Sequence, residues 1–159
     1  MPVGDALVAL GSNIGDKAAN VRQALALLTQ EGDIRLLASS RIFKTPPWGK
    51  TDQDWFVNAA ARVGTSLSPH QLLGRCLAIE RAMGRERGEK WGPRVIDLDV
   101  LAHGPTRISD KDLTLPHPYI TERAFVLAPL SDVAPEFVIK GRTVDQWLAA
   151  IDRSGVEPM

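Results

Sequence analysis

Two aspartates, Asp97 and Asp99, stand two residues apart in an otherwise apolar run over residues 95–101. Side chains two apart on a strand share one face, so the run predicts a strand with both carboxylates on one side and its apolar residues in the core. Two such carboxylates repel each other unless a cation joins them, and Mg²⁺ commonly takes one or two carboxylates together with substrate phosphates. The alternative is a pair of solvated aspartates that bind nearby arginines.

A cationic segment comes just before this strand. Residues 81–94 hold five cations against two acids, an excess of three positive charges, in a glycine-bearing stretch. Arginine offers forked donors to phosphate oxygens, so a cationic loop beside metal-seeking carboxylates indicates a polyphosphate substrate. An exposed charge run is the usual alternative, but the neighbouring aspartates favour phosphate binding. The five cations are Arg81, Arg85, Arg87, Lys90 and Arg94.

Two aromatic stretches offer a second kind of site. Residues 45–48 read Thr-Pro-Pro-Trp, and residues 55–58 read Trp-Phe-Val-Asn. A rigid backbone, aromatic planes and an amide can clamp a flat heterocycle by stacking and hydrogen bonding. Packing of the aromatic rings in the core is the alternative. Further along, His117 lies between two prolines and Arg123 follows it, and both are candidate donors to a phosphate chain unless the histidine is merely solvated.

Other common sites are not predicted. The sequence has no GxxxxGK[ST] phosphate loop and no GxGxxG turn between a strand and a helix. The Gly11-Ser12-Asn13 turn has little specificity. The three histidines lack metal-ligand spacing, and Cys76 falls on the buried stripe of a predicted helix. Zinc and thiol chemistry are therefore not expected.

The composition limits the class of protein. The chain has 159 residues, which predicts a single domain over 1–159. Its 19 Lys and Arg balance 19 Asp and Glu, and zero net charge argues against a general nucleic-acid binder. One cysteine allows no intramolecular disulfide and favours a reducing compartment. No secretory signal or membrane span is visible. We therefore expect a cytoplasmic single domain. We also expect a monomer whose partners are small molecules.

The elements that must position these residues follow from periodicity and caps. Residues 6–10 predict a strand, and a helical stripe through Val21 and Leu28 ends near Gly32. Residues 34–44 are extended, and 56–63 alternate as a strand. Ser68 and Gln71 form a capping box that begins a second helix, which ends at Gly84. Strand 95–101, a loop over 103–117, a helix over 121–128 stopped by Pro129 and a helix capped by Thr143 complete the chain.

This order is strand, helix, strand, strand, helix, strand, followed by helical additions. It is the split βαβ arrangement of ferredoxin-like α+β domains. We therefore expect a ferredoxin-like βαββαβ core with a mainly antiparallel sheet. Both long helices should lie on one face of that sheet.

The motifs together resemble one family. K-W-G-P-R-x-x-D-L-D-V-L, with T-P-P-W-G and F-V-N-A-A before it and L-P-H and R-A-F after it, is similar to 6-hydroxymethyl-7,8-dihydropterin pyrophosphokinase of folate biosynthesis. The resemblance runs over nearly the whole chain, and it implies the same ferredoxin-like fold. It further implies that ATP donates its pyrophosphoryl group to the hydroxymethyl oxygen of a pterin and leaves as AMP.

The resemblance also implies roles for named residues. Asp97 and Asp99 would hold two Mg²⁺ ions that bridge the phosphates of ATP. On the nucleotide side, phosphate contacts fall to Arg85, Arg94, His117 and Arg123, a closing loop carries Arg87 and Trp91, and Glu80 and Thr114 lie nearby. On the pterin side, the ring would lie between Phe56 and Phe125, with its amide edge read by Asn58 and by the segment that contains Thr45, Pro46 and Trp48.

Two other functions are open from the residues alone. One is a ferredoxin-like module that binds a nucleotide or RNA without chemistry, and the neutral charge argues against it. The other is a phosphohydrolase that uses the same metal site with water. The rigid Thr45–Trp48 segment and the two phenylalanines favour an organic acceptor instead.

The paired aspartates generate a first prediction. Asp97→Ala or Asp99→Ala should abolish turnover, because each removes one of the two metal-binding carboxylates, and Arg94→Ala should impair turnover without unfolding the protein. Steady-state kinetics together with circular dichroism would check this. Normal activity in either aspartate variant would remove the argument for a metal site.

Overall fold

An antiparallel sheet organises the molecule. The computed structural model describes residues 1–45, 54–84 and 95–159. In these residues six strands form the main sheet: β1 (Asp5–Ser12), β2 (Ile34–Ser39), β3 (Phe43–Thr45), β4 (Phe56–Thr65), β5 (Asp97–His103) and β10 (Glu157–Pro158). β4 and β1 lie at the centre, β5 pairs with the outer side of β1, and β2 and β3 follow one another along β4. All of these pairs are antiparallel, as the sequence predicts.

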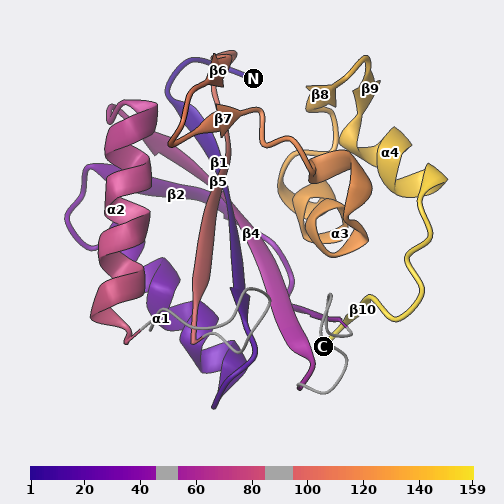
Figure 1. Cartoon of the computed structure of the whole chain (residues 1–159), viewed down its shortest axis with the longest axis horizontal. Helices are drawn as coiled ribbons and strands as arrows, with labels where there is room; N and C mark the ends of the chain where they lie inside the picture. The colour runs from indigo at the N-terminus through magenta and orange to yellow at the C-terminus, as the bar shows by residue number, and fades with distance from the viewer. Residues whose placement is uncertain (46–53, 85–94) are drawn as a thin grey trace.

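Two helices cover one face of this sheet. They are α1 (Lys17–Thr29) and α2 (Pro69–Ala82), and Figure 1 shows both on the same side. Asp16 caps α1, and the predicted capping box of Ser68 and Gln71 begins α2. Their buried stripes pack on the inward residues of β1, β4 and β5. The buried residues of this core include Val21, Ala24, Leu28, Leu72, Cys76, Ile79, Val8, Leu10, Val57, Leu98 and Val100.

The opposite face is covered by the C-terminal part of the chain. The 3-10 turn η1 (Ile120–Glu122), α3 (Ala124–Val133) and α4 (Val144–Ala150) pack there in a second core (Figure 1). A short hairpin of β6 (Ile108–Ser109) and β7 (Thr114–Leu115) precedes η1, and a second, of β8 (Val138–Ile139) and β9 (Arg142–Thr143), lies between α3 and α4. The ferredoxin-like core with C-terminal helical additions is therefore confirmed. Among the described helices, none is long and apolar enough to cross a membrane.

Several boundaries differ from the sequence prediction. The strand predicted over 6–10 is β1, which extends to Ser12, the strand predicted over 95–101 is β5, which begins at Asp97, and the extended stretch 34–44 is divided into β2 and β3. The helix predicted over 121–128 is instead α3, which continues past Pro129 to Val133. Proline removes one helical hydrogen bond, but Pro129 is itself buried and its neighbours Ala128 and Leu130 pack in the second core, which offsets that loss. α1 ends at Thr29, before Gly32, which takes a positive φ in the turn that follows. The predicted loop over 103–117 contains the β6–β7 hairpin.

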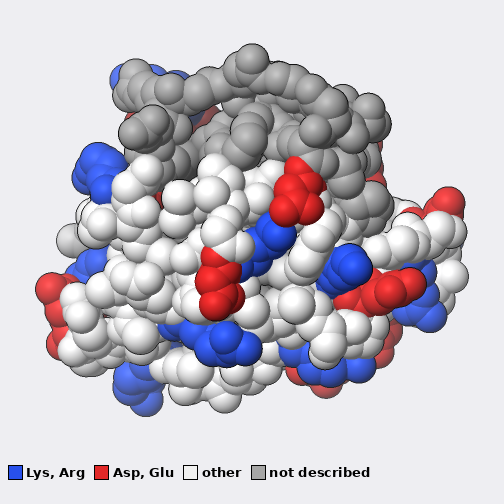
Figure 2. Space-filling view, turned by 90° about the horizontal axis from the view of Figure 1, so that it is seen from below, with Lys and Arg blue, Asp and Glu red and all other residues white. Residues whose placement is uncertain are grey.

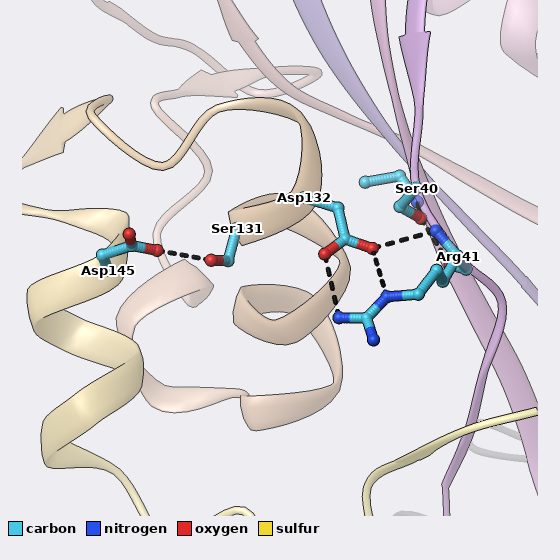
Figure 3. A network of polar contacts seen from close by, with 6 residues as sticks. Ser40, Arg41, Ser131, Asp132 and Asp145 are labelled. Atoms are coloured by element: carbon cyan, nitrogen blue, oxygen red, sulfur yellow. Dashed lines mark hydrogen bonds and ion pairs between the residues drawn. The ribbon is translucent and has the colours of Figure 1, made fainter.

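A polar network ties α3 to the sheet and to α4 (Figure 3). Asp132 of α3 accepts three hydrogen bonds from Arg41, from the backbone N–H at 2.9 Å and from Nε and Nη2 at 3.1 Å each. Arg41 lies between β2 and β3. Ser131 donates a short hydrogen bond to Asp145 of α4. The network holds α3 over the bend between β2 and β3, the segment that leads to Thr45.

This network generates a prediction about stability. Burial of Asp132 raises its pKa, but the hydrogen bonds and charge of Arg41 outweigh that effect and leave the pKa below the ordinary value of 3.8. A carboxyl whose folded-state pKa is depressed stabilises the fold above its unfolded pKa, and the stabilisation is lost as the pH falls through the folded value. At pH 7 we expect Asp132→Asn to lower the free energy of unfolding by about 1 kcal/mol.

Urea denaturation of Asp132→Asn, Arg41→Gln and the double variant would measure this coupling. The coupling energy should vanish when the pH falls below the folded-state pKa of Asp132. A coupling that is equal in acid and at neutral pH would contradict the assignment to this ion pair.

Candidate functional site

The register of the three central strands places the predicted site residues in one row. Asn58 of β4 lies opposite Gly11 of β1, and Gly11 lies opposite Asp97 of β5. Residues paired across antiparallel strands share a face. Val57, next to Asn58 in the chain, and Leu98, next to Asp97, are buried in the α1–α2 core, so the row lies on the opposite face, the one covered by η1 and α3. Two strand spacings separate Asn58 from Asp97 across the sheet, roughly 10 Å between backbones.

The paired aspartates have the orientation that the sequence predicts. Leu98 and Val100 are buried in the α1–α2 core, whereas Asp97 is half-buried and Asp99 is exposed. Both carboxylates therefore lie on the other face, with Asp99 opposite Ala9 of β1. The small side chain of Ala9 adds little bulk to the surface beside them.

Thr45 orients the amide of Asn58. Thr45 pairs with Phe56 at the start of β4, and its side chain is almost completely buried. Its hydroxyl donates to Oδ1 of Asn58 at 2.9 Å. In this arrangement Oδ1 faces the Thr45 hydroxyl, and the Nδ2 group is directed elsewhere as a donor. The structure thus brings together three predicted residues of the heterocycle site, namely Thr45, Phe56 and Asn58.

Gly11 is a site residue that the sequence reasoning missed. A Cβ atom at position 11 would come within 3.0 Å of Nδ2 of Asn58. This approach is tighter than ordinary van der Waals contact, so a side chain here would displace the Asn58 amide. The sequence analysis treated Gly11-Ser12-Asn13 as a turn of little specificity, but Gly11 and Ser12 belong to β1, and Ser12 and Asn13 are buried.

A hollow of about 260 Å³ joins Asp99 to the predicted nucleotide residues. Thr114 and His117 lie on its wall, so three residues predicted for the nucleotide side are brought together. The sequence reasoning missed the turn over residues 110–113, where Oδ1 of Asp110 accepts from the backbone N–H groups of Asp112 and Leu113. The lining residues are Leu73, Asp99, Val100, Asp110, Lys111, Asp112, Leu113, Thr114, His117 and Pro118.

His117 is held by its backbone and by its ring. Its N–H donates to the carbonyl of Leu101 at 2.8 Å, and its Nδ1 accepts from the backbone N–H of Tyr119 at 3.2 Å. Burial, and then the charge of Arg123, lower the pKa of His117 below its ordinary value of 6.5. The ring is therefore neutral at pH 7, with its proton on Nε2, where it can act as a hydrogen-bond donor.

Arg123 and Phe125 lie at the beginning of α3. Cζ of Arg123 lies 4.9 Å from the ring centre of Tyr119 and 5.8 Å from that of Phe125. Phe125 also packs against the core between α3 and the sheet. α3 packs on β4, the strand of Phe56. A ring bound between Phe56 and Phe125 stays a prediction.

Trp55 lies on the other face of β4 from Phe56. It packs against the α1–α2 core, and Nζ of Lys17 lies 3.9 Å from its ring centre. The same ammonium group binds Asp54 at 2.9 Å. For Trp55, packing in the core was the alternative to a role in the site, and packing is what the structure shows.

Glu80 is buried, with 3% of its surface exposed. Its Oε2 accepts from the backbone N–H of Leu98 at 2.8 Å, so it binds the strand that carries the aspartates. Burial, with the charges of Glu80 and Asp99, raises the pKa of Cys76 to about 12. That thiol therefore stays protonated, and a role of Glu80 in nucleotide binding stays a prediction.

The remaining predicted residues lie outside the described part of the chain. They are Pro46, Trp48, Arg85, Arg87, Trp91 and Arg94.

A magnesium site is compatible with the aspartates that are described. Asp97 and Asp99 are hard oxygen donors on one face, and Asp99 adjoins the hollow. Within residues 1–45, 54–84 and 95–159, no group of three or more His, Cys, Asp and Glu could hold a metal ion. Mg²⁺ commonly binds through one or two carboxylates plus substrate oxygens, so this donor set fits an ion whose other ligands come from substrate and water.

The charge of the described surface is mixed. Figure 2 shows Lys and Arg side chains interspersed with Asp and Glu, with no broad field of one sign among the described residues of that face. On this face positive and negative side chains are interspersed, and over the whole sequence their numbers are equal.

Comparison with known proteins gives consistent matches. The family described as 7,8-dihydro-6-hydroxymethylpterin-pyrophosphokinase matches residues 7–135. A 2-amino-4-hydroxy-6-hydroxymethyldihydropteridine pyrophosphokinase from Methylorubrum extorquens is 55% identical over 96% of both chains. The Bacillus subtilis protein of the same description is 44% identical over 82% of this chain and 78% of its own.

The fold has also been seen in solved structures. A crystallised HPPK-DHPS in complex with substrates has a TM-score of 0.75 and 14% identity, over 94% of this chain and 43% of the other. This chain thus spans less than half of that longer one. At this identity the likeness supports the fold alone.

His117 generates a prediction about titration. Its ring should titrate below pH 6.5 in the wild type. Arg123→Gln should move the pKa upward, because it removes a positive charge that disfavours protonation of the ring. Because the folded-state pKa is depressed, the neutral ring stabilises the fold above about pH 6.5, and this is lost as the pH falls through the folded value. NMR titration of the ring would measure both values. An unchanged pKa in Arg123→Gln would contradict the electrostatic link.

Proposed function

Because this chain belongs to the 7,8-dihydro-6-hydroxymethylpterin-pyrophosphokinase family, we propose that the α3 face of its sheet carries both substrates. The chain is a pyrophosphokinase of folate biosynthesis, which transfers pyrophosphate from ATP to the hydroxymethyl group of 6-hydroxymethyl-7,8-dihydropterin. The observation that supports the assignment most is the row from Asn58 through Gly11 to Asp97. It sets an amide and a carboxylate on one face, with a glycine between them.

The pterin belongs at the Asn58 end of this row. A pterin has a planar ring with an amide edge, which an asparagine side chain can recognise through its oxygen and its NH₂ group. The Thr45 hydroxyl holds that side chain in one orientation, and the bare backbone of Gly11 leaves it room. Phe56, half-buried at the start of β4, offers one wall for stacking, and Phe125 is assigned as the other.

The triphosphate belongs at the aspartate end. Asp97 and Asp99 would hold the magnesium ions, two by the family resemblance, and bound Mg²⁺ neutralises phosphate charge and favours loss of the hydroxyl proton. The neutral His117 ring, with its proton on Nε2, would donate a hydrogen bond to a phosphate oxygen, and the ring would stay neutral. Arg123 supplies a fixed positive charge, and the hollow beside Thr114 has room for part of the nucleotide.

The reaction needs alignment more than a strong base. The hydroxymethyl oxygen forms a bond to the β-phosphorus while the bond from that phosphorus to the α–β bridging oxygen breaks, and AMP leaves. The hydroxyl proton passes to solvent. Phosphoryl transfer of this kind depends mainly on in-line positioning and charge stabilisation. Asn58, proposed to bind the pterin, and Asp97, proposed to bind the metal, lie in one row of the same sheet, so the strands themselves would supply the alignment.

Further assignments belong to the same proposal. We propose that residues 1–159 act as one pyrophosphokinase domain, because both cores share the single main sheet. The phosphate contacts of Arg85 and Arg94, and the loop roles of Arg87 and Trp91, come from the family resemblance. A monomeric state and a cytoplasmic location are also part of this proposal. Burial of the free Cys76 is compatible with a reducing compartment.

Product analysis tests the function directly. The protein, Mg²⁺ and ATP, incubated with 6-hydroxymethyl-7,8-dihydropterin, should release AMP in proportion to pterin pyrophosphate, and the products can be resolved by chromatography. Omission of the pterin should stop AMP release. Formation of ADP, or phosphate release without pterin, would instead indicate a phosphohydrolase, and binding of nucleotide without any turnover would indicate a binding module.

A matched pair of variants makes this assay specific to the site. Asp99→Asn removes one carboxylate from the proposed metal site, whereas Asp152→Asn makes the same change at a residue bound to Ser154 beyond α4. The first variant should lose AMP formation and the second should retain it.

A further inference from the structure

β5 is an edge strand, and its backbone needs partners on the side away from β1. In the described sheet, β5 ends the strand order and pairs with β1 alone. Leu98 of this strand is nevertheless buried, with only 3% of its surface exposed, because α2 packs on β5. An edge N–H that is buried has no access to water, and an unsatisfied buried N–H is strongly unfavourable.

Glu80 supplies the partner for this N–H group. It lies near the end of α2, and its Oε2 accepts from the N–H of Leu98 at 2.8 Å. A buried carboxylate is itself unfavourable unless hydrogen bonds satisfy it, and a charged acceptor forms a stronger bond than a neutral one. The bond therefore joins α2 to one defined peptide of the edge strand.

That peptide lies between the two metal-binding candidates. Leu98 is the residue between Asp97 and Asp99, so any rotation of its peptide changes the direction of both side chains. β1 holds β5 from one side, through the pairing of Gly11 with Asp97 and of Ala9 with Asp99. Glu80 fixes the same short segment from α2.

We propose that Glu80 is a positioning residue for the metal site. Its carboxylate holds the Leu98 peptide in one orientation, so that Asp97 and Asp99 converge on one ion. The inference rests on the proposed function, because it takes these aspartates as the metal ligands. Glu80 acts through the backbone rather than on the ion. Its helix packs on the α1–α2 face, whereas the two aspartates lie on the α3 face.

Binding of a probe metal tests the inference without turnover. The test uses Mn²⁺ in place of Mg²⁺, with α,β-methylene-ATP as a nucleotide that cannot be cleaved at the transferred bond, and electron paramagnetic resonance measures free Mn²⁺. Glu80→Leu removes the acceptor at similar volume and should weaken Mn²⁺ binding by about 10- to 100-fold, the range found when groups that support metal ligands are lost. Glu80→Gln keeps an oxygen acceptor and should stay within about threefold of wild type.

Leu72→Ala is the matched control for stability. Leu72 is fully buried on the same helix and two turns from Glu80, so its truncation weakens the packing of α2 without touching the Leu98 N–H. Mn²⁺ affinity should be unchanged in this variant. Equal loss in Leu72→Ala and Glu80→Leu would reduce Glu80 to a general structural role and overturn the inference.

Hydrogen exchange gives a second measurement that does not depend on folding of Glu80→Leu. The Leu98 amide should exchange slowly in the wild type and in Glu80→Gln. Exchange as fast as in an exposed segment would overturn the inference. A loss of Mn²⁺ affinity as large in Glu80→Gln as in Glu80→Leu would also overturn it, because the charge itself would then be needed at the ion.

The two hypotheses fail in different ways. If the wild type forms no AMP with the pterin, the proposed function fails, while the Mn²⁺ and amide measurements still decide the role of Glu80. If AMP forms normally in the wild type but Mn²⁺ affinity is unchanged in Glu80→Leu, only the role of Glu80 is refuted.

Discussion

The antiparallel register of β4, β1 and β5 is the constraint on which the site depends. It sets Asn58, Gly11 and Asp97 in one row on the α3 face. A slip of one residue in either pair would turn the polar residues of that strand into the α1–α2 core and its apolar residues outward. The burial of Leu98 and Val100 makes such a slip unfavourable, so the same apolar side chains that stabilise the sheet also keep the carboxylates on the substrate face.

The division of the sheet into two faces explains how a small domain can be both stable and accessible. α1 and α2 cover one face along the strands, and their core contains most of the buried hydrophobic residues of β1 and β4. On the other face α3 covers part of the sheet and α4 packs on α3, and the network of Arg41, Asp132, Ser131 and Asp145 links α3 to the sheet and to α4. Polar residues can lie on this second face because the apolar core on the first face stabilises the sheet without them.

The local patterns were predictable from the sequence, and contacts between distant residues were not. Alternation around Asp97 and Asp99 gave the correct face, and the Ser68 capping box gave the start of α2, because both depend on neighbours within a few positions. The role of Gly11 depends on Asn58 across the sheet, and that of Glu80 on Leu98 eighteen residues away. The end of α3 was wrongly predicted at Pro129, because packing of a buried proline outweighs its local preference.

Placement of the metal-binding candidates on an edge strand has a physical reason. A central strand has neighbours on both sides, and their side chains would crowd an ion and a triphosphate beside the carboxylates. Among the described strands β5 pairs with β1 alone, and the residues of β1 opposite Asp99 and Asp97 are Ala9 and Gly11, so no large side chain of β1 faces the two aspartates. The same edge position deprives the strand of half its backbone partners. A buried glutamate from the covering helix supplies one of these partners from the α1–α2 side, whereas the two aspartates lie on the α3 face.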